Sequence, residues 1–296
     1  TFHLFHCNSK KYRDDYEYNQ RTDAFYKLHT ESALWRKPLR SNATCEVEGA
    51  ELISALSPED ISQIHAMMKK YPDIGDYVRI ASDGLHHDSA EEQPIINMSS
   101  ESGDVSEPTF EVLTRDGSVE TISLYLNPPF VCKVKAQDVP YNRKCGTFVF
   151  TAGYRYYPSV SSCYRIPPIT YTWYQAYAEC QAEGAHLAVI NSDTERLVLQ
   201  NITALDGRVP DSFNLAYFHI GFRAEKSTEN APRVFKTIFN QTLEEAGFNE
   251  WSATEPNNLG GKENCGSVFE NDGKLNDINC SGLYAFICEK EVRINT

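Results

Sequence analysis

The sequence lacks several features that would each indicate a particular class of protein. No apolar run approaches the about 20 residues that cross a bilayer as a helix, which argues against membrane insertion. Basic residues are in the minority, with 28 Lys and Arg against 41 Asp and Glu, and the net charge of −13 argues against a nucleic-acid partner. No two cysteines form a CxxC pair, so zinc-finger and thioredoxin-like interpretations are weak.

Cysteines and glycosylation sequons, by contrast, are frequent. Nine cysteines are many for a cytosolic chain of 296 residues. The acceptor asparagines of the sequons are Asn42, Asn97, Asn201, Asn240 and Asn279. No signal peptide precedes Thr1, which fits a mature form with its leader removed. These features predict a secreted, extracellular glycoprotein.

The chain contains an internal repeat. An offset of 138 residues relates Cys7, Leu28 and Trp35 to Cys145, Ile166 and Trp173. An offset of 135 residues relates Glu48-Gly49-Ala50 to Glu183-Gly184-Ala185. An offset of 156 residues relates Phe130-Val131-Cys132 to Phe286-Ile287-Cys288. A register that holds across several residue types is strong evidence for a repeat. We therefore expect two domains, 1–138 and 139–296, with their boundary in the polar stretch 133–143.

Local signals place two helices early in each copy. In the second copy Thr172 is the expected N-cap of a helix that stops at Gly184, and Ser192 to Glu195 reads as a capping box. In the first copy Ser57 is the expected cap, with Pro58 at the first helical position. Loop-rich segments and short strand-like ends follow. The expected fold class is α+β, with two helices packed on small sheets.

The second copy resembles the C-type lectin-like domain over residues 145–290. Its marks are Trp173, Cys180, Glu183-Gly184-Ala185-His186-Leu187, His219-Ile220-Gly221, Trp251, Glu255-Pro256-Asn257, Cys265, Leu275-Asn276-Asp277, Cys280 and Cys288. The tandem arrangement is similar to that of the two-domain immulectins of insect haemolymph, which recognise microbial surfaces. The resemblance implies small antiparallel sheets and a long loop region in each copy, with the first copy degenerate.

A calcium site follows from the donor types in this region. Calcium takes roughly 6–8 oxygens from carboxylates, amide carbonyls and water. Such oxygens are offered by Glu255, Asn257, Glu263, Asn276 and Asp277. Each residue alone is an ordinary turn former or surface acid. Together, at the family's spacing, they are expected to bind Ca²⁺ and, through it, sugar.

The same residues imply the class of sugar. Two hydroxyls of a vicinal diol that coordinate the ion still need acceptors for their protons and donors for their lone pairs, which carboxylates and amides supply. In the family the order Glu-Pro-Asn goes with mannose-type sugars (mannose, glucose, GlcNAc, fucose), and Pro256 is preceded by a cis bond. The implied function is pattern recognition in innate immunity, on microbial or self glycans, with lipopolysaccharide among the possible ligands.

Some positions depart from the family pattern. Leu275 replaces a usual Trp, and His219 begins the usual Trp-Ile-Gly as a histidine expected in the core or at its rim rather than on a metal. An auxiliary calcium site of some members uses acids near positions that are here Ala224, Asn258 and Asn264. We therefore expect no second ion.

The resemblance and the repeat register together predict four disulfides. These are Cys45–Cys132, Cys145–Cys163, Cys180–Cys288 and Cys265–Cys280. The first copy has Thr109 and Leu124 where the second has Cys265 and Cys280, so both members of a pair are lost together. Cys7 is left over, free or available to link an oligomer.

Other functions compete with this interpretation. Glu255 and Glu263 could form a glycosidase acid pair, but no nucleophile lies in a recognisable motif, so an enzyme is not expected. The stronger alternative is a protein- or lipid-binding lectin-like protein without sugar recognition. It is preferred for the first copy, where Glu107, Glu120 and Thr121 replace Glu263, Asn276 and Asp277. Gln93-Pro94-Ile95 is a poor substitute for Glu-Pro-Asn because it ends in an apolar side chain, and Glu107-Pro108-Thr109 comes too late in the chain. The loop carrying His86, His87, Asp88, Glu91 and Glu92 is expected to be solvated, and the alternative is a metal site at its two histidines.

Overall fold

The computed structural model of this chain divides into two compact units. It describes residues 12–30, 40–54, 56–81, 109–123, 128–139, 141–142, 144–148, 153–206, 208–225 and 233–292. The N-terminal unit comprises residues 17–45 and 50–137, and the C-terminal unit comprises residues 138–296 together with 1–16 and 46–49. The change of unit at Asp138 lies beside the expected boundary, but two short early segments belong with the C-terminal unit.

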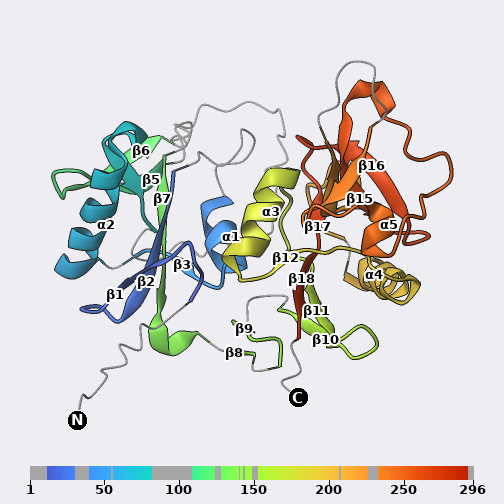
Figure 1. Cartoon of the computed structure of the whole chain (residues 1–296). Helices are drawn as coiled ribbons and strands as arrows, with labels where there is room; N and C mark the ends of the chain where they lie inside the picture. The colour runs from blue at the N-terminus through green and yellow to red at the C-terminus, as the bar shows by residue number, and fades with distance from the viewer. Residues whose placement is uncertain are drawn as a thin grey trace, which may run out of the picture. The chain divides into compact units, whose positions relative to one another are not determined.

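The N-terminal unit is built on a seven-stranded sheet. Its strands are β1 (Glu17–Asn19), β2 (Ala24–His29), β3 (Glu51–Leu52), β4 (Tyr77–Arg79), β5 (Thr109–Thr114), β6 (Val119–Ser123) and β7 (Phe130–Lys135). The order is β1-β2-β7-β4-β5-β6, and β3 also pairs with β7. Figure 1 labels β1, β2, β3, β5, β6 and β7 of this sheet. The core lies between this sheet and a helix.

That helix is α2 (Pro58–Lys70), which follows the shorter α1 (Arg40–Val47) and precedes the 3-10 turn η1 (Pro72–Ile74). Ser57 caps α2 in a reciprocal capping box with Asp60, and Pro58 stands in the first turn, as predicted. Ile64 and Met68 are fully buried against strands of the sheet, at the spacing of one helical face.

The C-terminal unit contains two separate sheets and a hairpin. One sheet has the order β10-β11-β18-β12 and the other the order β14-β13-β15-β16, with β17 parallel to β13. The bounds of these strands are β10 (Arg155–Tyr157), β11 (Ser162–Arg165), β12 (His186–Leu187), β13 (Tyr217–Ala224), β14 (Phe235–Thr237), β15 (Glu263–Phe269), β16 (Leu275–Asn279), β17 (Ala285–Phe286) and β18 (Cys288–Glu291). The hairpin is β8 (Tyr141–Asn142) with β9 (Thr147–Phe148), and the turn η2 (Ala136–Asp138) precedes it.

Three helices and one 3-10 turn complete the unit: α3 (Trp173–Ala182), α4 (Asp193–Asp206), α5 (Leu243–Ala246) and η3 (Leu259–Gly261). Thr172 caps α3 in a full capping box, as predicted. The box predicted for α4 forms only in part. Ser192 caps the amide of Glu195, but the Glu195 carboxylate accepts from the amide of Asn191 instead of Ser192. No helix among the described residues has both the length and the apolar character needed to cross a membrane.

All four predicted disulfides are present. Cys45–Cys132 and Cys180–Cys288 each join the early helix of a unit to its last sheet strand. Cys145–Cys163 and Cys265–Cys280 lie in the C-terminal unit only. Cys7 is outside the described residues.

The strand pairings of the first copy recur in the second copy at the offsets that relate the two copies in the sequence. The pairings β1–β2, β2–β7 and β3–β7 correspond to β10–β11, β11–β18 and β12–β18. The bounds of β1, β3 and β6 map onto those of β10, β12 and β16 at the offsets of 138, 135 and 156 read from the sequence. The α+β fold class is therefore confirmed, and these three strand pairings occur in both units.

A buried cluster of ion pairs ties residues 12–16 and 46–49 into the C-terminal unit. The Arg13 guanidinium bonds the Glu179 carboxylate through two nitrogens, at 2.7 and 3.0 Å. Arg165 pairs with Glu183 and also donates to the carbonyl of Val47 at 2.8 Å. These arginines have no exposed side-chain surface, so their charges depend on these carboxylates.

Candidate functional site

The five predicted ligand residues lie on one loop and two paired strands of the C-terminal unit. Glu255 and Asn257 are on the loop after Trp251, and Glu263 is the first residue of β15. Asn276 and Asp277 are on β16, which pairs antiparallel with β15. Residues separated by about twenty positions are thereby brought together at one end of a hairpin.

A backbone hydrogen bond, a disulfide and two unusual backbone conformations shape the loop and the strands beside it. The amide of Ser252 donates to the carbonyl of Leu275, and the Cys265–Cys280 disulfide joins β15 to the residue that follows β16. The Glu255–Pro256 bond is cis, as the resemblance implied. Asn258 adopts the left-handed backbone conformation with φ of 48°, which an asparagine tolerates better than most residues.

Asp277 is at the centre of the hydrogen-bond network. Its side chain is fully buried, and its Oδ1 accepts from the Asn257 amide at 3.0 Å. Its Oδ2 accepts from the Asn258 amide at 3.1 Å and from the Arg233 Nη1 at 2.6 Å. The Asp277 carboxylate therefore orients the loop that carries Asn257.

The other ligand residues join the same network. The Asn257 Nδ2 donates to the Glu255 Oε1 at 2.7 Å, which places an amide beside a carboxylate. The Glu263 Oε2 accepts from the Leu259 amide, and the Glu263 amide donates to the Asn258 Oδ1 at 3.1 Å. All three loop contacts hold oxygen-bearing side chains in one small region.

Asn276 enters the network from the buried side. It is 4% exposed, and its Nδ2 donates to the Ser267 Oγ at 3.2 Å and to the Asp277 carbonyl at 2.8 Å. The structure thus links Glu255, Asn257, Glu263 and Asp277, directly or through Asn258, whereas the described hydrogen bonds join the Asn276 side chain only to Ser267 and to the backbone of Asp277.

The negative charges in this region disfavour one another. Partial burial raises the pKa of Glu255, and the Asp277 and Glu263 carboxylates raise it further. Partial burial likewise raises the pKa of Glu263, with Asp277 adding to the shift and Arg233 opposing it. A bound cation would relieve this repulsion. Three carboxylates and two amides form an oxygen-only donor set, which suits a hard cation such as calcium and not a soft metal.

Sequence reasoning did not identify Arg233 as part of this region. Its Nη1 donates to the Glu263 carbonyl as well as to Asp277, and its guanidinium carbon lies 5.1 Å from the centre of the Phe235 ring. Arg233 stands 30 residues before Glu263 in no recognisable motif, so no local signal could have indicated it.

The departures from the family pattern have structural explanations. Leu275 is 1% exposed and packs in the hydrophobic core with Trp251 at its edge. His219 is fully buried, its Nε2 lies 3.3 Å from the Gly282 carbonyl, and burial lowers its pKa to about 4. His219 is therefore a neutral core histidine, as expected. Ala224 is buried, whereas Asn258 uses its Oδ1 to accept from Glu263.

Among the residues that the structure describes, the equivalent positions of the N-terminal unit form no such network. Glu120 and Thr121 lie on β6 with exposed side chains, whereas their counterparts Asn276 and Asp277 are buried. Glu107, Gln93-Pro94-Ile95 and the residues His86, His87, Asp88, Glu91 and Glu92 lie outside the described residues, as does Leu124.

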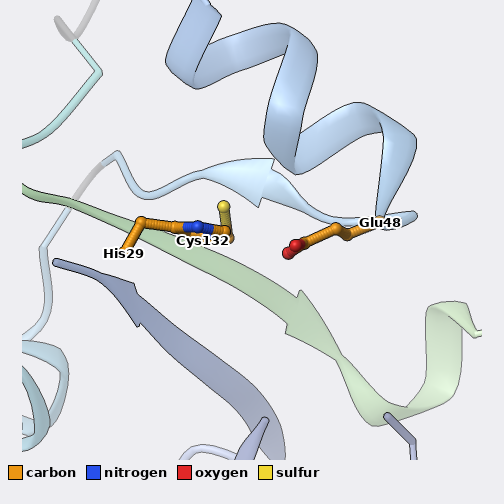
Figure 2. Close-up of side chains that lie close together, drawn as sticks. All are labelled: His29, Glu48 and Cys132. Carbon is orange, nitrogen blue, oxygen red and sulfur yellow. The ribbon is translucent and has the colours of Figure 1, made fainter. Parts of the chain in front are cut away.

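Three other side chains with metal-binding atoms are drawn in Figure 2. The Cys132 sulfur is bonded to Cys45, so it is not a thiolate ligand. The Glu48 carboxylate accepts a hydrogen bond from the Tyr16 hydroxyl at 2.6 Å, and His29 stacks on Phe130 with ring centres 4.4 Å apart. These contacts account for the three side chains without a metal ion.

The sequons differ in accessibility. Asn201 on α4 and Asn240 are exposed, whereas Asn42 on α1 and Asn279 at the end of β16 are half-buried. Asn97 is outside the described residues. Glycosylation is therefore most accessible at Asn201 and Asn240.

Comparison with known proteins identifies the C-terminal unit. The family model of the Lectin C-type domain matches residues 169–290. The hemolymph lipopolysaccharide-binding protein of Periplaneta americana is 38% identical over 135 residues, which are 45% of this chain and 51% of that protein. The C-type lectin lectoxin-Enh5 of Pseudoferania polylepis is 30% identical over 132 residues, covering 43% of this chain and 75% of the relative.

Other relatives match over a smaller part of their length. The asialoglycoprotein receptor 1 of Mus musculus is 32% identical over 44% of this chain and 42% of the receptor. The chain thus spans about half or less of the Periplaneta and mouse proteins. Among solved structures, the mouse scavenger receptor C-type lectin carbohydrate-recognition domain is 22% identical, with a TM-score of 0.38 over 48% of this chain and 97% of that domain.

Proposed function

Because this chain belongs to the C-type lectin family, we propose that its C-terminal unit binds sugars of the mannose type through calcium held by Glu255, Asn257, Glu263, Asn276 and Asp277. The family binds carbohydrate and is not enzymatic, and its domains generally bind calcium. The observation that carries the proposal is the network centred on Asp277, which links an oxygen-only donor set on two strands and one loop.

The carboxylate and amide side chains of the site have different roles in sugar recognition. When bound, calcium supplies open coordination positions for two vicinal hydroxyls of a sugar. The Glu255 and Glu263 carboxylates would accept hydrogen bonds from these hydroxyls, and the Asn257 and Asn276 amides would donate hydrogen bonds to the hydroxyl oxygens. With Glu255 before the proline and Asn257 after it, the acceptor and donor stand in the order that the family associates with mannose, glucose, GlcNAc and fucose.

The biological setting of this activity is also a proposal. The Periplaneta americana relative is named for lipopolysaccharide binding in hemolymph. By this relationship the protein is secreted and recognises glycans of microbial surfaces, lipopolysaccharide included, as a pattern-recognition protein of innate immunity. Four disulfides support an extracellular location.

The first copy of the repeat, residues 1–138, is proposed to be a degenerate lectin-like domain that binds no calcium by this mechanism, and residues 17–45 and 50–137 of it form the N-terminal unit. The strand pairings that it shares with the second copy support a common fold, and the exposed side chains of Glu120 and Thr121 argue against a buried ligand cluster. We propose that it contacts protein or lipid, or that it serves as a spacer.

A glycan array with and without EDTA tests the proposed function. We expect mannose-type glycans to be retained in calcium and released by EDTA. Binding that persists in EDTA would refute the calcium mechanism. Binding of lipid or protein with no glycan retained would favour the alternative of a lectin-like protein without sugar recognition.

A further inference from the structure

Arg233 is a cation that contacts two of the residues assigned to calcium. Its Nη1 donates to the Asp277 Oδ2 at 2.6 Å and to the backbone carbonyl of Glu263. The Arg233 side chain is 21% exposed and the Asp277 side chain 0%, so the pair is shielded from solvent on the aspartate side. An ion pair in this setting is stronger and less screened by salt than one on the open surface.

A positively charged residue such as Arg233 balances the negative charge of this region. The Glu255, Glu263 and Asp277 carboxylates carry three negative charges, and one divalent ion neutralises only two of them. A guanidinium supplies the remaining positive charge. Because Arg233 bonds the Asp277 Oδ2, it also fixes the rotation of the carboxylate whose Oδ1 holds the Asn257 amide.

We propose that Arg233 is a positioning residue, a fixed cation that keeps the loop of residues 255–259 in its ligand-binding conformation before calcium arrives. This inference rests on the proposed function for its relevance to calcium, but its physical content concerns the calcium-free protein. Arg233 pins Asp277, Asp277 accepts the amides of Asn257 and Asn258, and those amides set the course of the loop.

The contact of the Arg233 guanidinium with Phe235 supports a preformed arrangement. Its central carbon lies 5.1 Å from the Phe235 ring centre, and Phe235 is a buried residue of β14. The ring restricts where the guanidinium lies, so less side-chain freedom is lost when it bonds Asp277. Hydrogen-bonding partners outside the ligand set commonly control metal affinity in this way.

The test compares the wild-type full chain with Arg233→Gln and Arg233→Lys. Lys236→Gln is the matched control, because Lys236 of β14 forms an ion pair at 2.9 Å with Glu225, the residue that follows β13, and among the described residues it contacts no ligand residue. Backbone amide exchange in EDTA is the first readout. In Arg233→Gln the Asn257 and Asn258 amides should exchange about tenfold faster, as expected for a weakened hydrogen bond to a charged group.

Calcium calorimetry is the second readout. Arg233→Gln should weaken calcium binding by about tenfold, the usual effect of losing a partner of a metal ligand. Arg233→Lys should recover most of that loss, because both bonds of Arg233 come from a single nitrogen that an ammonium can imitate. Lys236→Gln should change neither readout.

The two proposals fail separately. If the wild-type chain binds no calcium, the proposed function is wrong, and amide exchange in EDTA still tests Arg233. If exchange is unchanged in Arg233→Gln, the positioning role is wrong. Tighter calcium binding by Arg233→Gln would also overturn it, because Arg233 would then be a competitor of calcium and not a support.

Discussion

Tyr16 and Tyr154 occupy equivalent positions of the repeat, and each donates a hydrogen bond to the equivalent glutamate. The Tyr16 hydroxyl lies 2.6 Å from the Glu48 carboxylate and the Tyr154 hydroxyl 2.7 Å from the Glu183 carboxylate. Burial raises the pKa of both tyrosines, so both remain protonated donors. The duplication visible in the sequence is therefore preserved as a pair of matching buried contacts in the C-terminal unit.

Glu183 carries the first prediction, because it is the partner of Arg165 and also lies 3.5 Å from Arg13. Glu183→Gln should lower the free energy of unfolding by about 3–5 kcal/mol, since it leaves buried guanidinium charge without compensation. Urea unfolding measures this loss. Glu225→Gln, which removes a partly exposed ion pair with Lys236, should cost less than about 1 kcal/mol. Equal effects of the two substitutions would contradict the role of the cluster.

Asp277 carries the second prediction. Asp277→Ala should abolish calcium binding and mannose binding while leaving the fold intact, because the backbone pairing of β16 with β15 and the Cys265–Cys280 disulfide do not use the Asp277 side chain. Calorimetry with calcium, retention on mannose resin and circular dichroism check the three outcomes. Glu250→Ala, which removes only an exposed pair with Lys274, should bind both ligands normally.

The third prediction concerns the choice of sugar. The double substitution Glu255→Gln and Asn257→Asp exchanges the acceptor and the donor on one side of the diol, so it should shift preference from mannose toward galactose. Competition by the two monosaccharides for an immobilised glycan measures the shift. If the wild-type protein binds both sugars equally, the assignment of specificity to this pair is wrong.

The fourth prediction concerns pH. Burial raises the pKa of Glu195 from 4.5 to about 8, and the nearby Glu289 carboxylate adds to the shift. An acid with a higher pKa in the folded state binds a proton on folding, so the free energy of unfolding should fall as pH rises from about 4.5 to about 8. Glu195→Gln should flatten this slope in urea titrations in EDTA. An unchanged slope would mean that Glu195 does not titrate in this window.

The fifth prediction concerns the number of ions. The full chain should bind a single calcium ion, because the exposed Glu120 and Thr121 replace the buried Asn276 and Asp277 in the N-terminal unit. Glu120→Gln with Thr121→Val should leave calcium binding unchanged in calorimetry. A second binding event that this double variant removes would place calcium in the N-terminal unit after all.

The sequence by itself determined the features that depend on residue type and spacing. The three offsets read from the repeat also relate the bounds of strands in the two copies, and the family resemblance together with the repeat register predicted all four disulfides. The caps Ser57 and Thr172 also acted as expected, because a cap bonds backbone groups only two or three residues away. These are local or repeated signals, and a linear pattern contains them.

Only the tertiary structure decided which distant groups meet. Arg233 reaches Asp277 across 44 positions, and Arg13 reaches Glu179 across 166, with no spacing rule that connects them. Equivalent positions of the repeat also differ in burial: Asp277 is 1% exposed, whereas Thr121 is exposed. The physical reason is that a side chain's charge partners and solvation depend on how loops from different sheets pack together, and neither quantity is a property of neighbouring residues in the chain.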